Sequence, residues 1–375
     1  AMHHLGVPTT RALSLVATGD QIMRDMFYDG RPAYEPGAIV CRVAPSFLRF
    51  GNFEIFAAQG DAAVLRQLAD YTIRHHFPHI EDNGAGLYVS LFEAVCRRTA
   101  HMIVQWMRVG FVHGVMNTDN LSVLGLTIDY GPYGWIDNYD PDWTPNTTDA
   151  QGRRYRYGHQ SKIALWNLIR FANSLYPLVE DAKPLESALD QYIETYEREQ
   201  REMMHAKLGL EADVKPEFIT ELLEVLQLVE TDMTLFYRRL ADLEVCDDRA
   251  ASVSDTELVA HFRDAHYRPD EISADDTARI GRWIRMYQDR IAHLGTSNLE
   301  RRQRMNAVNP RFVPRNYLAQ VAIEQAEEGD YSGVETLLNI LRSPYGEHPE
   351  HADFAKKRPE WARRKPGCSM LSCSS

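Results

Sequence analysis

The chain has 375 residues, a formal net charge of −12 at pH 7, 44% hydrophobic and 25% charged residues. This composition is ordinary for a globular protein, and the length is enough for more than one lobe. The acidic balance argues against nucleic acid as a partner, because such proteins usually carry a basic stripe. The sequence contains no apolar run of the roughly 20 residues that span a bilayer, so we expect no membrane partner.

The first 60 residues are predicted to form strands and turns. Two short apolar, β-branched runs, 10–17 and 38–43, flank the turn-rich segment 29–37. From Asp61 the apolar residues follow helical spacing, and Asp61 is in position to cap the first helix. Residues 113–150 are irregular and rich in Asp, Gly, Pro, Asn and Tyr, and so long a loop is usually functional. Helical spacing is found at 63–73, 87–109, 160–176, 185–208, 216–241, 256–264, 274–293, 315–328 and 331–342.

The loop 113–150 carries the most informative residues. It begins His113-Gly-Val-Met-Asn-Thr-Asp-Asn120, and Asp129 starts an Asp-Tyr-Gly run nine residues after Asn120. The apolar segment between them, 121–128, is predicted to form a hairpin or short strand, which would bring Asn120 and Asp129 together. Hard oxygen ligands of this kind suit Mg²⁺, although both residues could instead cap turns. His113 is expected to brace the loop.

Protein kinases build their metal site in a similar way, from a catalytic-loop Asn and the Asp of Asp-Phe-Gly. In a His-Arg-Asp-x-x-x-x-Asn template counted from His113, Asn120 falls on the metal-binding Asn, but Val115 occupies the position of the catalytic Asp. The order of strands, helices, ligand-bearing loop and further helices also fits a kinase. The sequence has no Gly-x-Gly-x-x-Gly motif.

Several contiguous runs make the chain similar to the selenoprotein O (SelO/YdiU) family of kinase-fold protein adenylyltransferases. The runs are Gly6–Leu15, Glu35–Gly51, His113–Asp142, Arg315–Gln320 and Ser372–Ser375. The resemblance implies an α+β fold that is protein-kinase-like and predominantly helical, with a truncated N-terminal β lobe. A kinase-like nucleotide lobe needs a glycine-rich loop, a strand Lys that binds the phosphates and a helix Glu that holds this Lys. In the family, the segment matching residues 1–6 follows the helix that holds this Glu. We therefore expect the glycine-rich loop and the Lys-bearing strand to be missing.

The resemblance also implies an organisation in three parts. Residues 1–60 would be the remnant of the nucleotide-binding lobe, 61–300 the helical kinase-like lobe, and 301–375 a helical extension with a flexible, Cys-containing tail. Cys373, the third residue from the end, matches a position where some family members carry selenocysteine. It could form a regulatory disulfide with Cys368 or with another chain, or be an unimportant free thiol.

The activity implied by the family is the Mg²⁺-dependent transfer of AMP from ATP to Ser, Thr or Tyr hydroxyls of proteins, with Mn²⁺ as the alternative metal. The resemblance assigns proton acceptance to Asp119, the metal to Asn120 and Asp129, and the nucleotide to Arg42, Arg49 and Asp129. Guanidinium groups suit phosphate oxygens because they are planar, permanently charged and bidentate. In the family ATP is reversed relative to ordinary kinases, so the α-phosphorus faces the acceptor.

Other interpretations remain open at this stage. From the residues alone, Asp119 could brace its loop, and Arg42 and Arg49 could form surface salt bridges. The chain could be a conventional kinase-type phosphotransferase, or a non-catalytic nucleotide-binding or scaffold fragment because the Lys and the Gly-rich loop are missing. The expected partners are ATP and protein substrates. The expected location is the cytoplasm for a bacterial protein, with the mitochondrion as the eukaryotic option.

Overall fold

The computed structural model describes residues 1–25, 30, 32–81, 86–211, 214–244, 253–368 and 371, and within them it is mostly helical with small antiparallel sheets. The α+β, predominantly helical part of the predicted fold class is therefore confirmed. The strands are β1 (Arg11–Arg24), β2 (Ala33–Val43), β3 (Phe111–Val112) and β4 (Gly134–Trp135). The helices are α1 (Phe50–Ala58), α2 (Ala62–His76), α3 (Gly86–Val109), α4 (Gln160–Val179), α5 (Ala182–Leu208), α6 (Pro216–Leu228), α7 (Met233–Asp242), α8 (Asp255–Ala260), α9 (Ala274–Leu294), α10 (Asn298–Val308), α11 (Asn316–Glu327) and α12 (Ser332–Ile340).

Side chains cap several of the helices, α2 and α7 among them. Asp61 accepts a hydrogen bond from the Val64 amide, which confirms it as the cap of α2. The prediction of one helix over 216–241 is wrong, because Asp232 caps a new helix, α7, by accepting from the amide of Leu235. No described helix is both long enough and apolar enough to cross a bilayer.

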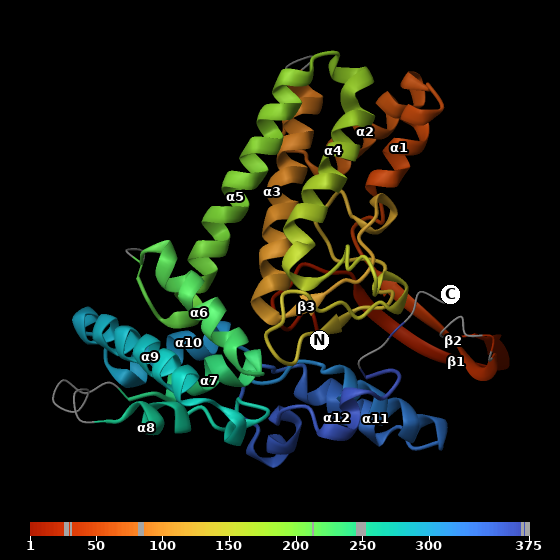
Figure 1. Cartoon of the computed structure of the whole chain (residues 1–375). Coiled ribbons are helices and arrows are strands. Elements are labelled where there is room, and N and C mark those ends of the chain that lie inside the picture. Colours follow the sequence, from red (N-terminus) through yellow and green to blue (C-terminus); the bar gives the residue numbers. More distant parts are fainter. Residues whose placement is uncertain are drawn as a thin grey trace.

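Helices α1 to α10 form two groups that meet at α3 and α5, and α11 and α12 form a separate pair (Figure 1). Helices α1 to α5 form the upper group in this view, in which α3 and α5 lie side by side, and α6 to α10 form the lower left group. Each group has its own apolar core, and α3 contributes Trp106 to the first core and Val104 to the second. The irregular loop 113–150 follows directly from α3 and β3, so it begins where the two cores meet.

The prediction of strands and turns over the first 60 residues is wrong at its end, because Phe50–Ala58 form helix α1. Aromatic contacts fix this helix to α4. The ring of Phe50 stacks on that of Phe171 with a centroid distance of 4.8 Å, and Phe53 meets the same ring edge-on at 5.0 Å. All three side chains are fully buried. Burying a side chain of this size contributes on the order of 2 kcal/mol, so the first turn of α1 has a firm support.

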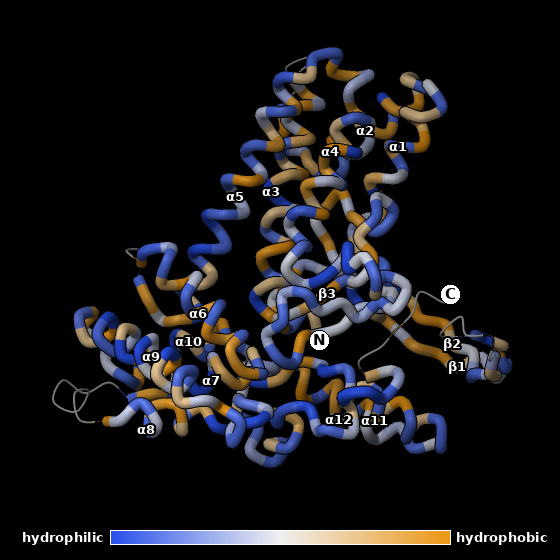
Figure 2. Tube along the Cα trace, viewed as in Figure 1, coloured by the Kyte–Doolittle hydropathy of each residue, from blue (hydrophilic) through white to orange (hydrophobic). Residues whose placement is uncertain are grey.

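The β1–β2 hairpin projects from the helical body, as the red ribbon in Figure 1 shows. Apolar residues on both strands are exposed, among them Leu13 at 72% and Tyr34 at 71%. Figure 2 shows the hairpin as an apolar segment where it leaves the body. Contiguous apolar area of this kind usually marks a contact surface in folded proteins.

A buried charge network ties Asp137 of the loop 113–150 to α7 and to the segment before α11. Arg315 donates to Asp137 at 2.8 Å and forms a two-pronged pair with Asp232 at 2.8 and 3.0 Å. Burial alone would lower the pKa of Arg315, but the two carboxylates outweigh it and hold that pKa well above the usual value. Arg358 adds a second cation 3.4 Å from Asp137.

The chain beyond α12 returns to the loop 113–150. Leu371 donates its amide to the carbonyl of Pro145 at 2.9 Å and accepts from the amide of Thr147 at 2.8 Å. Cys368 is a buried thiol that forms no disulfide. Cys373 lies outside the described residues, so the predicted pairing of these two cysteines is not tested.

His266 gives the fold a predictable response to acid. It is buried with Nδ1 3.1 Å from the Thr231 hydroxyl, and burial, followed by the nearby Lys357 ammonium, lowers its pKa to about 4. The unfolded chain binds this proton near pH 6.5 and the folded chain does not, so stability is lost as pH falls from 6.5 toward 4. The expected loss is roughly 3 kcal/mol, since one pKa unit corresponds to about 1.4 kcal/mol.

Urea unfolding of the wild type and His266→Gln at pH 7 and pH 4.5 measures this contribution. The carboxylates that also titrate in this range are common to both proteins and cancel in the difference. We expect the wild type to lose more stability than the variant between the two pH values. Equal losses in the two proteins would contradict the assignment to His266.

Candidate functional site

The predicted hairpin between Asn120 and Asp129 forms, although as a short loop with a single ladder contact. Leu121 pairs with Thr127 in an antiparallel bridge. Asn120 precedes one member of this pair and Asp129 follows the other by two residues, so both emerge from the open end of the hairpin.

A neighbouring segment runs beside the hairpin and leads into α1. Arg49 pairs with Ser122, the amide of Phe50 donates to the carbonyl of Leu121 at 3.1 Å, and the amide of Val123 donates to the carbonyl of Leu48 at 3.0 Å. These bonds fix the N-terminus of α1 to the hairpin. The backbone of the predicted phosphate ligand Arg49 is therefore held in place relative to the segment that carries the predicted metal residues.

The carboxylate of Asp129 faces this guanidinium. Arg49 Nη1 lies 4.0 Å from Asp129 Oδ2, and both side chains are partly exposed. A pair this long and this exposed is weak, so the carboxylate remains available to a cation. Asp129 also has a left-handed backbone with φ of 53°, a conformation in which Asp and Asn are enriched among non-glycine residues.

Asn120 is oriented by its own amide group. Its Nδ2 donates to the carbonyl of Val115 at 2.9 Å, which directs one end of the side chain into the loop. The carbonyl oxygen at the other end is the atom suited to a hard cation. Val115, which replaces the catalytic Asp of the kinase template, therefore contributes its backbone to the site.

Asp119 is exposed and lies against the first turn of α1. The side chain of Asn117 accepts a hydrogen bond from the Asp119 amide at 3.0 Å. The hydroxyl of the preceding residue, Thr118, donates a hydrogen bond to the carboxylate of Glu54 in α1 at 2.7 Å. The loop therefore holds the backbone of Asp119, while its side chain is exposed on one side and packs against Gly51 of α1 on the other.

Arg42 reaches the site from β2. Its guanidinium carbon lies 4.6 Å from the centroid of the Tyr130 ring, within the range of a cation–π contact. The Tyr130 hydroxyl bonds to that of Thr9, and burial raises the pKa of Tyr130 to about 12, so the ring stays neutral. Because Tyr130 follows Asp129 in the chain, this contact holds Arg42 next to the predicted metal ligand.

Two buried side chains support the hairpin from the first core. His113 Nε2 lies 2.9 Å from the carbonyl of Ile128, as expected for a residue that braces the loop. Burial lowers the pKa of His113, so the ring is neutral and Nε2 carries the donated proton. Trp106 donates from Nε1 to the hydroxyl of Thr127 at 2.8 Å.

Sequence reasoning missed the residues that hold the predicted ones in place. Asn52 accepts from the backbone amide of Arg49 at 2.9 Å, and Tyr130 supports Arg42. Asn52 lies three residues after Arg49, which is the spacing of a capping box at the start of a helix. This spacing could have predicted the role of Asn52 from the sequence. The support from Tyr130 depends on β2 reaching the loop, and no local pattern reveals it.

The predicted pair fits Mg²⁺ better than a metal held by a full set of protein ligands. Among the residues that the structure describes, no group of three or more His, Cys, Asp or Glu side chains could hold a metal ion. One carboxylate and one amide oxygen are enough for Mg²⁺, which usually keeps water and substrate phosphates as its other ligands.

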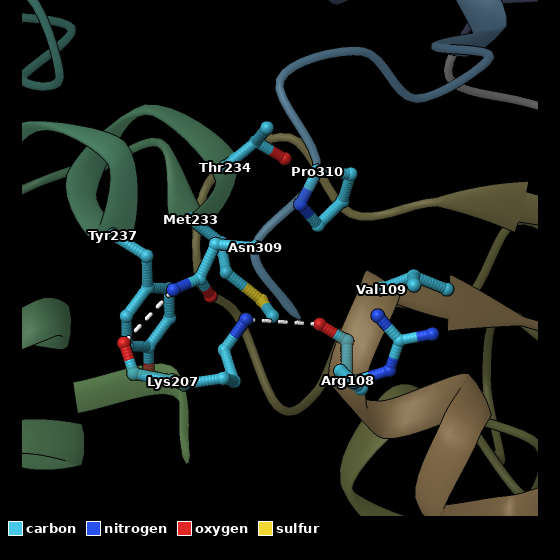
Figure 3. Close-up of a pocket in the computed structure, with 8 residues that line it drawn as sticks. All are labelled: Arg108, Val109, Lys207, Met233, Thr234, Tyr237, Asn309 and Pro310. Atoms are coloured by element: carbon cyan, nitrogen blue, oxygen red, sulfur yellow. Dashed lines mark hydrogen bonds between the residues drawn. The ribbon is translucent and has the colours of Figure 1, made fainter. Parts of the chain in front are cut away.

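Two hollows elsewhere in the molecule do not include the five predicted residues. One, lined by Arg108, Lys207 and Asn309 (Figure 3), has about 10 Å³, room for no more than about one water. The other is a cleft of about 610 Å³ between α3 and α5, lined by residues such as His101 and Glu199. Of the five predicted residues, Arg42, Asp119 and Asp129 are exposed, and Arg49 and Asn120 are half-buried.

Comparisons with known proteins identify the family. The family model described as "Protein adenylyltransferase SelO" matches residues 1–342. The "Protein nucleotidyltransferase YdiU" of Rhodopirellula baltica is 56% identical over 387 residues, which cover 100% of this chain and 72% of that protein. The proteins of the same name from Azoarcus sp. and Aromatoleum aromaticum are 56% and 55% identical, and the chain covers 71% and 70% of their lengths.

The chain therefore belongs to the SelO family of protein adenylyltransferases, and by family it is an enzyme. The resemblance inferred from the sequence runs is confirmed.

Proposed function

We propose that the protein transfers AMP from ATP to Ser, Thr or Tyr hydroxyls of other proteins, with Mg²⁺ or Mn²⁺, on a kinase-like fold. The observation that carries the proposal is the meeting of Arg49 and Asp129 at the open end of the hairpin that also carries Asn120. The two groups lie side by side with only a weak mutual bond, so the guanidinium is free to take a phosphate oxygen and the carboxylate to take a metal ion.

Each side chain has one task in the proposed reaction. Asn120 and Asp129 would hold the metal, whose charge would offset that of the phosphates. Arg42 and Arg49 would bind phosphate oxygens, with Arg42 held in place by the ring of Tyr130. Positioning and charge neutralisation would supply most of the rate enhancement.

Asp119 would accept the proton of the attacking hydroxyl. The hydroxyl oxygen forms a bond to the α-phosphorus, the bond from that phosphorus to the bridging oxygen breaks, and pyrophosphate leaves. The proton passes to the Asp119 carboxylate. The exposure of this side chain supports the role, because a protein substrate must reach it.

Labelled ATP tests the proposal against a conventional phosphotransferase. With magnesium and an acceptor protein, we expect label from α-³²P-ATP on protein and none from γ-³²P-ATP. Chelation of the metal with EDTA should abolish the labelling. Label from the γ-phosphate would favour the kinase-type reaction instead.

Calorimetric measurement of ATP binding distinguishes both enzyme reactions from the third candidate, a non-catalytic scaffold. We expect ATP with magnesium to bind with a dissociation constant tighter than about 1 mM, or roughly −4 kcal/mol. Weaker binding together with no label transfer would favour the scaffold.

A further inference from the structure

Gly51 faces the Asp119 carboxylate across the first turn of α1. A Cβ atom built on Gly51 would overlap Oδ1 of Asp119, and it would lie 3.0 Å from Cγ and 3.6 Å from Cα of the same residue. Real Cβ atoms essentially never approach another heavy atom closer than 3.0 Å. Any side chain at position 51 therefore requires Asp119 to move.

The need for glycine here comes from space and not from backbone conformation. Gly51 is not among the glycines with positive φ, and it lies inside a helix, where glycine is up to about 1 kcal/mol less favourable than alanine. The Asp119 contact is the one feature around Gly51 that an added methyl group would overlap, since all three nearest atoms belong to that residue.

The backbones on both sides of this contact are held. On the helix side, Phe50 and Phe53 pack on the buried ring of Phe171. On the loop side, Asn117 accepts from the Asp119 amide, and Thr118 donates to Glu54. The group that gives way is therefore the carboxylate, which is the free end of a short side chain.

We propose that Gly51 is a positioning residue for AMP transfer. Its missing side chain lets the Asp119 carboxylate lie against α1, in the place from which it accepts the proton of the attacking hydroxyl. The inference rests on the proposed function, because it assigns Asp119 that role. A proton acceptor must come within about 2.6–3.2 Å of the hydroxyl, so a carboxylate displaced by an added methyl group loses its reach.

Gly51→Ala tests this inference with a clear kinetic signature. We expect kcat for AMP transfer to fall about 10–100-fold, the scale on which catalysis responds to misplacement by about 1 Å. Binding of ATP and magnesium by calorimetry should be unchanged, and Tm unchanged or higher. Gly152→Ala is the matched control, because its added Cβ would lie 3.9 Å from its nearest neighbour. It should keep wild-type kcat.

A double-mutant cycle shows whether Gly51 acts through Asp119. Asp119→Asn removes the base, so adding Gly51→Ala to it should lower kcat no further. If Gly51→Ala keeps the wild-type kcat while Asp119→Asn is inactive, only this inference is overturned. The same holds if Gly51→Ala lowers kcat as much in the Asp119→Asn background as it does in the wild type. A wild-type kcat in Asp119→Asn would overturn the proposed role of Asp119 and this inference with it.

Thermal stability gives a test that does not depend on the reaction. If Gly51→Ala lowers Tm, Asp119→Ala in the same chain removes the overlapping Cγ and Oδ1 atoms and should restore it. A Tm that stays low in the double variant would overturn the proposed contact.

Discussion

Replacing Asp129 by asparagine is expected to lower the rate of AMP transfer by about 10²–10³-fold, the usual effect of removing one group that stabilises charge in a transition state. The carboxylate is the only charged member of the predicted metal pair. Asparagine has nearly the same shape and tolerates the left-handed backbone that Asp129 adopts, with φ of 53°. The fold should therefore survive while the metal site loses its charge.

The measurement combines turnover of α-labelled ATP with calorimetric binding of ATP at several magnesium concentrations. We expect Asp129→Asn to need much more magnesium for the same nucleotide affinity. Asp181→Asn is the control, since Asp181 caps α5 and Asn caps helices equally well. Wild-type turnover in Asp129→Asn would contradict the proposed metal site.

Replacing Arg315 by leucine is expected to lower the free energy of unfolding by about 3–5 kcal/mol, the usual effect of breaking a buried ion pair from one side. Asp137 and Asp232 would then be buried without their main cation. Burial already raises the pKa of Asp137, and the loss of Arg315 should raise it further.

Denaturant unfolding at pH 7 measures this effect. Arg263→Leu is the matched control, because Arg263 also pairs with an aspartate, Asp270 at 2.9 Å, but on the surface. Exposed pairs contribute about 0–1 kcal/mol, so this control should stay close to the wild type. Equal losses in the two variants would show that the buried network does not anchor the loop to α7 and α11.

The helical content of the chain could be predicted because apolar spacing and capping residues act over a few positions. Asp61 illustrates this, since its side chain caps α2 as expected. The division of 216–241 into α6 and α7 was missed, although Asp232 is also a capping residue. Its partners Arg315 and Tyr267 come from distant parts of the chain, and apolar spacing over a dozen residues does not reveal them.

The sequence by itself determined the family, most of the helical segments and the residue types of the candidate site, because the run from His113 to Asp129 contains its own hairpin and the predicted oxygen ligands. Only the tertiary structure decided which residues hold those ligands in place. Tyr130 beneath Arg42 and Gly51 beside Asp119 are contacts between elements far apart in the chain. Such contacts depend on how α1 and β2 pack against the loop, and a pattern of neighbouring residues does not record that packing.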